Sequence, residues 1–430
     1  TELSQTLDDR ELDRLQLSTV GYYLHESNPG NGLVRDKTEH GAPASIAAIG
    51  LGLATIPVLI ERAVIDREFA SELVLKRLRF FRDAPQGVQP DATGYRGFYY
   101  HFLHMKTGRR VWDCELSTLD SAFLFAGMLT CATYFDDDSE EETEVRRLAD
   151  ELYRRADWKW ALAGGAALSH GWRPETGFIP HTYRGYDEAL LAYLLGLGSP
   201  TFPLPVESYA AYCATYQWKR IYDHEVLYSG PLFTHQLSHL WVDFRGIQDA
   251  FMREHGSDYF ENSRAATQIH QEYAIRNPLE FEGYGEHCWG ITATDGPGFE
   301  KRWVKGIERE FFGYHARGAP YGPDDGTVAP WVVVASLPFA PEIVIPSIRA
   351  MSRLNLGATK RYGFKPSFNP TYAVAGSPAG WVTPYHFGVD QGPVILMIEN
   401  HRTGLVWRIM QRCPYVVTGL RRAGFQGGWL

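Results

Sequence analysis

Two kinds of helical segment alternate along this 430-residue chain. The segments that begin near Ser45, Ser117 and Tyr186 are apolar on nearly every side, which is typical of helices packed on all faces. Residues 67–83 and 140–157 instead carry a charged face. An inner and an outer layer of helices would produce this alternation. We predict helices at 8–25, 44–64, 67–83, 117–135, 140–157, 186–197, 205–219, 233–254, 258–276, 327–336, 340–355 and 390–422, the last of them broken.

The alternation indicates an all-α fold made of helical hairpins in a ring. In such a ring the inner helices run in the same direction, so their N-terminal ends would gather at one mouth. Strand signals are weak and local, at Gly97–Phe102 and at Gly171–Tyr183, where Pro174–Gly177 would form a turn between two short arms. No low-complexity linker divides the chain, so we predict a single domain over residues 1–430.

One uncharged run, Ala42–Ile60, has the length of a membrane span. Gly50, Gly52 and Pro57 interrupt it and charged residues follow at once, so we interpret it as a buried inner helix and expect no membrane insertion. The chain begins at Thr1 without an initiator Met or a leader. We expect a mature form in the periplasm or outside the cell rather than in the cytoplasm.

Composition narrows the class of ligand. The formal net charge of -9 and the absence of a basic cluster argue against binding of nucleic acid. Twelve Trp and 24 Tyr favour a protein that stacks flat apolar faces against a ligand, as sugar-binding proteins do. The five cysteines are scattered and odd in number, which predicts buried thiols rather than a disulfide framework or a zinc ribbon.

Carboxylates stand at the starts of two of the apolar helices. Asp113, Glu115 and Asp120 surround the start near Ser117, and the pair Asp187 and Glu188 opens the segment "DEALLAYLLGLG". Ser117 with Asp120 has the form of a capping box, and Asp187 is a natural N-cap.

Glu115 and Glu188 have no such explanation, because Glu115 lies outside the cap and Glu188 would fall in the first turn of an apolar helix. Glycoside hydrolysis uses two acidic side chains in different environments, one to protonate the leaving oxygen and the other to activate water. Purely structural carboxylates are the competing interpretation.

Two further segments carry candidate chemistry. His235, His239 and Asp243 recur at four-residue spacing, which is compatible with zinc ligation on a helix. No HExxH pattern accompanies them, and we expect these side chains to form hydrogen bonds and to hold no metal. The loop Phe281–Gly298 is rich in polar and aromatic residues without helical period, which is typical of a pocket lining. A serine nucleophile is not expected, since GxSxG is missing.

Seven ordered motifs resemble the putative glucoamylase-like family that contains the bacterial endo-β-1,2-glucanases. They extend over residues 15–425 and read "ELSTLDSAFLFAG", "GYDEALLAYLLGLGSP", "GPLFTHQLSHLWVDFRG", "DYFENSRAAT", "NPLEFEGYGEHCWGITATDGPG", "GTVAPWVVVASLPFAPE" and "GVDQGPVILMIENHRTGLVW". The resemblance implies an (α/α)6 toroid, a six-hairpin barrel with short β-hairpins in the loops at the mouth. It also implies an inverting, endo-acting hydrolase that cleaves β-1,2-glucan to sophorose-type oligosaccharides without a cofactor.

By motif, the acids of that family fall on Glu188 and Glu115. We expect Glu188 to be the general acid and Glu115 the general base, with Asp113 or Asp120 as the alternative base. Aromatic platforms and polar tips would line the substrate cleft. The expected substrate-binding residues are Tyr99, His101, Trp172, His181, Tyr186, Asp187, His235, Trp241, Arg245, Tyr284, Glu286, Trp289 and Trp381.

Other activities stay open on the sequence. An exo-acting or transglycosylating enzyme on β-1,2-glucooligosaccharides would have the same motifs, and a non-catalytic glycan-binding protein would keep the cleft without using the acids. A lyase or epimerase acting on uronic sugars would need cationic partners, for which only Arg96, Arg184 and Arg245 are candidates.

Overall fold

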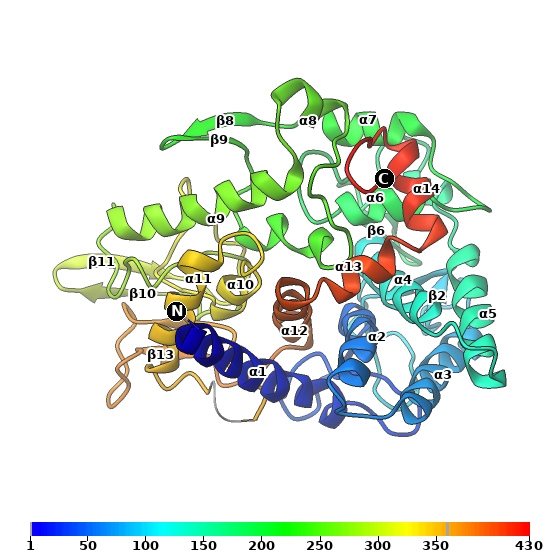
Figure 1. The fold of residues 1–430 in the computed structure, drawn as a ribbon, viewed down its shortest axis with the longest axis horizontal. Helices are drawn as coiled ribbons and strands as arrows, with labels where there is room; N and C mark the ends of the chain where they lie inside the picture. The colour runs from blue at the N-terminus through cyan, green and yellow to red at the C-terminus, as the bar shows by residue number, and fades with distance from the viewer. Residues whose placement is uncertain (1, 358–360) are drawn as a thin grey trace. The chain divides into compact units, whose positions relative to one another are not determined.

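The computed structural model describes residues 2–357 and 361–430 and is mostly helical (Figure 1). The prediction of an all-α class with short strand pairs is confirmed. Contacts between Cα atoms group the chain into two compact units. The first unit comprises the described parts of Thr1–Tyr22, Trp218–Leu237 and Phe260–Arg402, and the second comprises Tyr23–Gln217, Ser238–Tyr259 and Thr403–Leu430. Each unit is assembled from three separate stretches, so the prediction of one domain stays a prediction.

The second unit contains the apolar helices of the first half of the chain. Its helices are α2 (Ile46–Glu61), α3 (Arg67–Asp83), α4 (Thr118–Tyr134), α5 (Glu140–Arg155), α6 (Leu190–Leu197), α7 (Val206–Cys213), α8 (Ala250–His255), α13 (Leu405–Met410) and α14 (Pro414–Arg422). Helices α2 and α4 are buried along almost their whole length, whereas α3 and α5 bury one face each. The predicted alternation of wholly buried and half-buried helices is therefore present in this unit.

Close packing of α2 against α4 depends on two glycines. A Cβ atom on Gly127 would lie 2.0 Å from the carbonyl oxygen of Gly50, and a Cβ on Gly50 would lie 2.2 Å from the carbonyl oxygen of Phe123. No side chain fits at such distances, so the two backbones touch directly. The run predicted to be a buried inner helix is thus packed inside the unit, and none of the helices described is long and apolar enough to cross a membrane.

A small antiparallel sheet lies at the starts of these helices. Its five strands, in the order β2 (Gly94–Tyr95), β3 (Phe98–Tyr100), β5 (Leu116–Ser117), β6 (Gly171–Arg173) and β7 (Gly177–Phe178), are joined by backbone hydrogen bonds, and β1 (Ala44–Ser45) pairs with β4 (Phe102–Leu103). In this register Tyr99 faces Ser117, and Leu116 faces Trp172. Both predicted strand regions are confirmed, and the sheet fixes the backbone next to Glu115.

The first unit contains α9 (Tyr259–Arg276), α10 (Pro330–Val334), α11 (Pro341–Ser352), α12 (Gly388–Arg402) and most of α1 (Glu2–His25). Its strands form three pairs, β8 (Trp218–Ile221) with β9 (His224–Leu227), β10 (Glu300–Val304) with β11 (Ile307–Phe311), and β12 (Phe368–Asn369) with β13 (Trp381–Val382). Within its core the guanidinium of Arg317 donates to both carboxylate oxygens of Asp325, at 2.7 and 3.0 Å, and neither side chain is exposed.

Three helix predictions are wrong in detail. The expected helix 205–219 is the shorter α7, which ends at Cys213, and strand β8 begins at Trp218. The expected helix 233–254 is two 3-10 turns, Leu232–His235 and Leu237–Leu240, followed by irregular backbone and the short α8, and Gly246 in this stretch has φ +74. The helix expected from 186 begins only at Leu190, with Ala189 as the N-cap residue. The helix expected at 390–422 is broken, as predicted, and consists of α12, α13 and α14.

Candidate active site

His101 lies between two of the predicted acids. Its Nδ1 is 3.2 Å from Oε1 of Glu115, and its Nε2 is 3.5 Å from Oδ1 of Asp120. The imidazole stacks on Phe102 with ring centroids 4.0 Å apart. The backbone N–H of His101 donates to the carbonyl of Glu115, so the sheet holds ring and carboxylate together. Both nitrogens therefore face carboxylates, an arrangement that suits the doubly protonated ring.

The pKa values of His101 and Glu115 are shifted in opposite directions by the charge that each carries. Burial lowers the pKa of His101, but the carboxylates of Asp120, Glu115 and Asp36 outweigh burial and raise it to about 9. Burial alone would raise the pKa of Glu115, but the hydrogen bond and the positive charge of His101 lower it below its usual value. Glu115 is thus held ionised at neutral pH, as a general base requires.

Asp36 is a member of this group that the sequence analysis missed. It lies in the loop before α2, and burial raises its pKa to about 6 while His101 opposes that shift. The signal was present in the sequence, because an acid precedes the first apolar helix just as acids precede α4 and α6.

Asp120 combines two roles. Ser117 is the N-cap residue of α4 and its Oγ accepts from the backbone N–H of Asp120, as the capping pattern predicts. The same hydroxyl lies 2.5 Å from Oδ2 of Asp120, and the other carboxylate oxygen faces His101. Asp113, by contrast, is an exposed residue with φ +47 whose carbonyl accepts from Arg173.

Asp187 and Glu188 lie in the turn that precedes α6. The Oδ1 of Asp187 accepts from the N–H of Ala189 at 2.9 Å and from the hydroxyl of Tyr212 at 3.1 Å. The Oγ of Ser238 accepts a hydrogen bond from the backbone N–H of Leu191, so a side chain satisfies an N–H group in the first turn of α6. Glu188 therefore stands just outside the helix, and not in its first turn as predicted.

The surroundings of Asp187 and Glu188 favour the protonated, neutral forms of both carboxyl groups. Burial raises the pKa of Asp187 to about 6. Burial also raises the pKa of Glu188 well above its usual value, and the negative charges of Asp187 and Asp120 raise it further. Glu188 can consequently keep a proton near neutral pH, as a general acid requires.

Tyr183 shows that the acids gather in one place. After burial, the causes that raise the pKa of this phenol are the charges of Glu188, Asp120, Asp187 and Glu115. The ring of Tyr183 stacks on His170 with centroids 4.0 Å apart. Four of the predicted acids thus act on a single side chain. Tyr183 was not among the predicted site residues, although it stands four and five residues before two of these acids.

The other predicted binding residues of the second unit have different surroundings. Trp172 is half-buried and lies 4.7 Å from Tyr95 between ring centroids, and His181 is exposed. Tyr186 is buried, with its ring 5.5 Å from that of Tyr259.

Three other predicted binding residues are buried or paired with another side chain. Tyr99 and Trp241 are fully buried, and Trp241 stacks on Phe123. The guanidinium of Arg245 donates to the carboxylate of Asp243. Their contact with a substrate stays a prediction.

The remaining predicted residues lie in the first unit. The Nε2 of His235 lies 2.9 Å from the carbonyl of Ser229, the hydroxyl of Tyr284 donates to Asp324, and the indole N–H of Trp289 donates to Ser347. Glu286 is exposed, whereas Trp381 is half-buried in β13.

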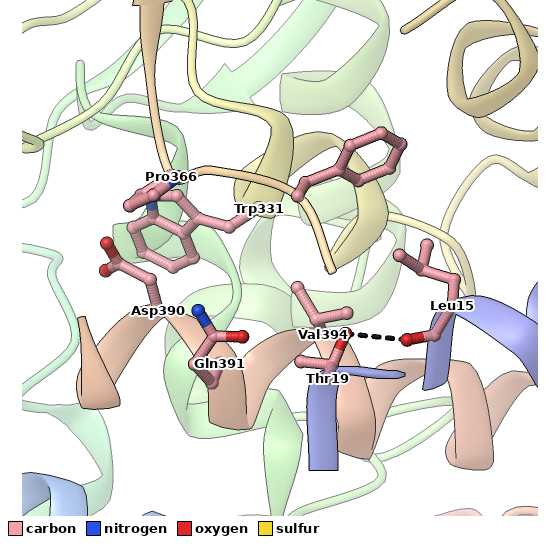
Figure 2. Close-up of a pocket in the computed structure, with 8 residues that line it drawn as sticks. Leu15, Thr19, Trp331, Pro366, Asp390, Gln391 and Val394 are labelled. Carbon is pink, nitrogen blue, oxygen red and sulfur yellow. Dashed lines mark hydrogen bonds between the residues drawn. The ribbon is translucent and has the colours of Figure 1, made fainter. Parts of the chain in front are cut away.

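The same unit contains a pocket that the sequence analysis did not identify (Figure 2). It is a small hollow whose roughly 240 Å³ of space between atoms includes open solvent, and it is lined by Leu15, Thr19, Trp331, Phe364, Pro366, Asp390, Gln391 and Val394. Asp390 and Gln391 come from the first turn of α12, and the indole of Trp331 comes from α10. Asp390 is thus one more acid at the start of a largely buried helix, beside an aromatic ring.

The predicted zinc-compatible spacing is not realised as a helical face. His235 lies in the first 3-10 turn and His239 in the second, where its ring contacts Phe244 at a centroid distance of 4.7 Å, while Asp243 binds Arg245. Among the residues that the structure describes, no group of three or more His, Cys, Asp or Glu side chains is placed to hold a metal ion.

Acids whose pKa values are shifted in opposite directions, at helix starts of a largely helical fold, are the arrangement that acid-base glycoside hydrolysis requires. The chain belongs to the putative glucoamylase family, whose profile matches residues 180–414, more than half of its length. The resemblance drawn from the sequence motifs is confirmed.

Individual relatives agree with this assignment. A putative glucoamylase from Bacteroides uniformis is 32% identical, with a TM-score of 0.86 over 98% of both chains. The endo-β-1,2-glucanase of Chitinophaga pinensis, solved with sophorotriose and glucose, is 26% identical, with a TM-score of 0.86 over 98% of this chain and 99% of its own. An exo β-1,2-glucooligosaccharide sophorohydrolase from Parabacteroides distasonis is 29% identical over 96% of this chain. The present chain spans only 58% of that relative.

Proposed function

We propose that this protein is an inverting glycoside hydrolase that cleaves β-1,2-glucan, with Glu188 as general acid and Glu115 as general base. One observation carries the assignment of the pair: the two carboxyl groups are held in opposite protonation states around Tyr183. Burial and the charge of Asp187 keep the proton on Glu188, and His101 keeps the proton off Glu115.

These protonation states suit hydrolysis with inversion. Glu188 would donate its proton to the glycosidic oxygen while the bond from that oxygen to the anomeric carbon breaks. Glu115 would accept a proton from a water molecule whose oxygen bonds to the same carbon from the opposite side. The reaction leaves Glu188 ionised and Glu115 protonated, and exchange with solvent restores both groups.

The relatives support the substrate, and one of them supports the endo mode of action. Two relatives named above act, by their names, on β-1,2-glucan or its oligosaccharides. The endo-acting relative matches 98% of this chain and the exo-acting relative matches 96% of it. An exo-acting enzyme that releases sophorose is the competing assignment.

Incubation with linear β-1,2-glucan, laminarin and soluble starch tests the proposal. We expect only β-1,2-glucan to be shortened, to a ladder of sophorose-type oligosaccharides whose new reducing ends have inverted anomeric configuration by NMR. Release of disaccharide alone, with no ladder, would establish exo action. Exhaustive chelation should leave the rate unchanged.

Variants identify the acids. Glu188→Gln and Glu115→Gln should each lower turnover by roughly 10²–10⁴-fold, since general acid-base catalysis contributes about that much per group. Glu207→Gln is the matched control, because Glu207 is an exposed glutamate in the first turn of α7 and should keep full turnover. Asp390→Asn probes the pocket of Figure 2. Loss of activity in Asp390→Asn together with full activity in Glu115→Gln would move the base to Asp390.

A non-catalytic glycan-binding protein is the second candidate. It would bind β-1,2-glucan equally well with and without the substitution Glu188→Gln, and it would release no reducing ends from any glucan. A lyase or epimerase is less well supported, because two of its three cationic candidates have partners: Arg245 is paired with Asp243 and Arg96 lies 3.7 Å from Asp157. The third candidate, Arg184, is exposed.

A further inference from the structure

The hairpin β10–β11 is anchored to the first unit by one of its two faces. The guanidinium of Arg302 lies over the ring of Tyr372 at 3.6 Å, and that of Arg309 lies over Phe281 at 4.5 Å. Phe311 is buried and meets Tyr372 edge to face. Arg302 and Arg309 are directly opposite each other in the hairpin, so these contacts belong to the same face of the ribbon.

The other face of the hairpin turns to solvent with two large aromatic side chains. Trp303 is 74% exposed and Phe299, one residue before β10, is 73% exposed. Because side chains alternate along a strand, Lys301 and Trp303 share this face. Phe299 directly precedes the strand, and its ring centroid lies 6.4 Å from that of Phe312 and 6.3 Å from that of His315. Glu310 pairs with Lys301, and Glu308 pairs with Trp303, so these exposed carboxylates belong to the same face.

This outward face is unusual for a hairpin that is already anchored. Nothing in the packing of the described part of the unit requires an indole there, because the anchoring contacts are made by the opposite face. Four residue steps separate Phe299 from Trp303, which is roughly 13 Å along extended backbone. Flat apolar rings at that spacing, with carboxylates and an ammonium group beside them, match a pyranose chain, which has apolar ring faces and hydroxyl groups at its edges.

The charges also distinguish the ligand from a protein partner. The buried centre of a protein interface is depleted of charged residues. Here Lys301, Glu308 and Glu310 occupy the space next to the rings, and burying them against another protein would require partners for all three. Sugar hydroxyls can donate to the carboxylates and accept from the ammonium group while remaining solvated.

We propose that the outward face of β10–β11 is a binding platform for a β-linked glucan chain, with Trp303 as its principal contact. Its ligand is identified through the proposed function, but its role is to hold long chains and not to take part in bond cleavage. The platform therefore matters for polymers and not for short oligosaccharides.

Affinity electrophoresis in gels that contain linear β-1,2-glucan tests the platform, with Glu188→Gln as the parent so that the glucan survives. Adding Trp303→Ala should weaken the apparent affinity by about 3- to 10-fold, since an aromatic contact of this kind contributes roughly that factor. Trp303→Phe should restore most of the retardation. Phe69→Ala, which removes an exposed aromatic ring from α3, is the matched control and should behave like the parent.

In the active enzyme, Trp303→Ala should lower kcat/KM on the polymer by a similar factor and change kcat/KM on a short oligosaccharide by less than twofold. Equal retardation of parent and Trp303→Ala, or a parent that is not retarded, overturns the platform. Equal losses on short and long substrates would place Trp303 in the catalytic cleft, and a change of mass in solution on Trp303→Ala would make the face an interface between copies. Either result also overturns it.

The experiment separates the two proposals. A wild-type protein that leaves every glucan intact, yet loses glucan binding with Trp303→Ala, refutes the hydrolase and keeps the platform. An active hydrolase whose binding and polymer kinetics do not respond to Trp303→Ala refutes the platform alone.

Discussion

Replacing Asp187 with asparagine should move the alkaline limb of the pH-rate profile toward lower pH. The negative charge of Asp187 is one of the causes that keep the proton on Glu188, and asparagine removes that charge. The amide oxygen can still accept from the N–H of Ala189 and from the hydroxyl of Tyr212, so the turn before α6 keeps its shape. The substitution thus changes charge with little change of geometry.

The size of the shift follows from Coulomb's law. Two unit charges roughly 4–6 Å apart at an effective dielectric constant of about 20 interact by about 3–4 kcal/mol, and one pKa unit is worth about 1.4 kcal/mol. Because the pKa of Asp187 is itself raised to about 6, its charge is complete only above that pH. We expect the alkaline limb, which lies above that pH, to shift by up to about 2–3 pH units, with the acidic limb, which reports Glu115, unchanged.

The assay is kcat/KM on β-1,2-glucan from pH 4 to 9, measured as new reducing ends. Asp91→Asn is the control, because Asp91 is an exposed acid paired with Arg109 and its loss should leave both limbs in place. An alkaline limb that stays where it was, or moves to higher pH, contradicts the electrostatic account of Glu188. A loss of rate that is the same at every pH would mean that Asp187 only positions its neighbour.

The remaining predictions concern stability. An acid whose pKa is raised by folding costs stability as pH rises above its unfolded value of 4.5, so Glu188→Gln should be more stable than wild type by roughly 1–3 kcal/mol at pH 8 and equal at pH 4, by urea denaturation. Asp325→Asn leaves the buried guanidinium of Arg317 without its counter-ion and should cost about 3–5 kcal/mol, seen as a large fall in Tm; an unchanged Tm would show that the pair is not buried. Gly127→Ala places a Cβ atom against the carbonyl of Gly50 and should cost about 1–3 kcal/mol, whereas a neutral result would mean that α2 and α4 can separate freely.

Long apolar periodicity was the most predictive feature of the sequence. Helix α3 lies over the residues expected for it, and α2, α4 and α5 differ from the prediction by no more than three residues at either end. The pattern of burial, on all faces in α2 and α4 and on one face in α3 and α5, continues along each helix. The segment around His235 was predicted wrongly for a physical reason: four-residue spacing is compatible with a helix, but it does not exclude successive 3-10 turns. The hairpin β10–β11 escaped notice because its two faces carry charged and aromatic residues in nearly equal measure.

The acids of the candidate site were predictable as a group, but their partners were not. Glu115 and Glu188 stood out because each lies at the start of an apolar helix and helix capping explains neither of them. The bridge that His101 makes between Glu115 and Asp120 depends on the pairing of β3 with β5, two strands too short to leave a pattern. Asp36 precedes α2 just as the other acids precede α4 and α6, but its effect on His101 depends on the conformation of the loop before α2.

Because the second unit is built from separate stretches of the chain, it cannot be completed until its last stretch has been synthesised. The second unit begins at Tyr23 but needs the stretch Thr403–Leu430, whose helix α14 packs against α6 and whose α13 packs against α2 and α4. On the ribosome, α2 is therefore followed by 343 further residues (62–404) and α4 by 270 (135–404) before their last partner, α13, emerges. Contacts of such long sequence separation form slowly, and the unfinished chain exposes apolar surface meanwhile. A cell that makes this protein has to shield α2 and α4 throughout translation, and shortening the chain before α13 should yield an aggregating product rather than a smaller folded one.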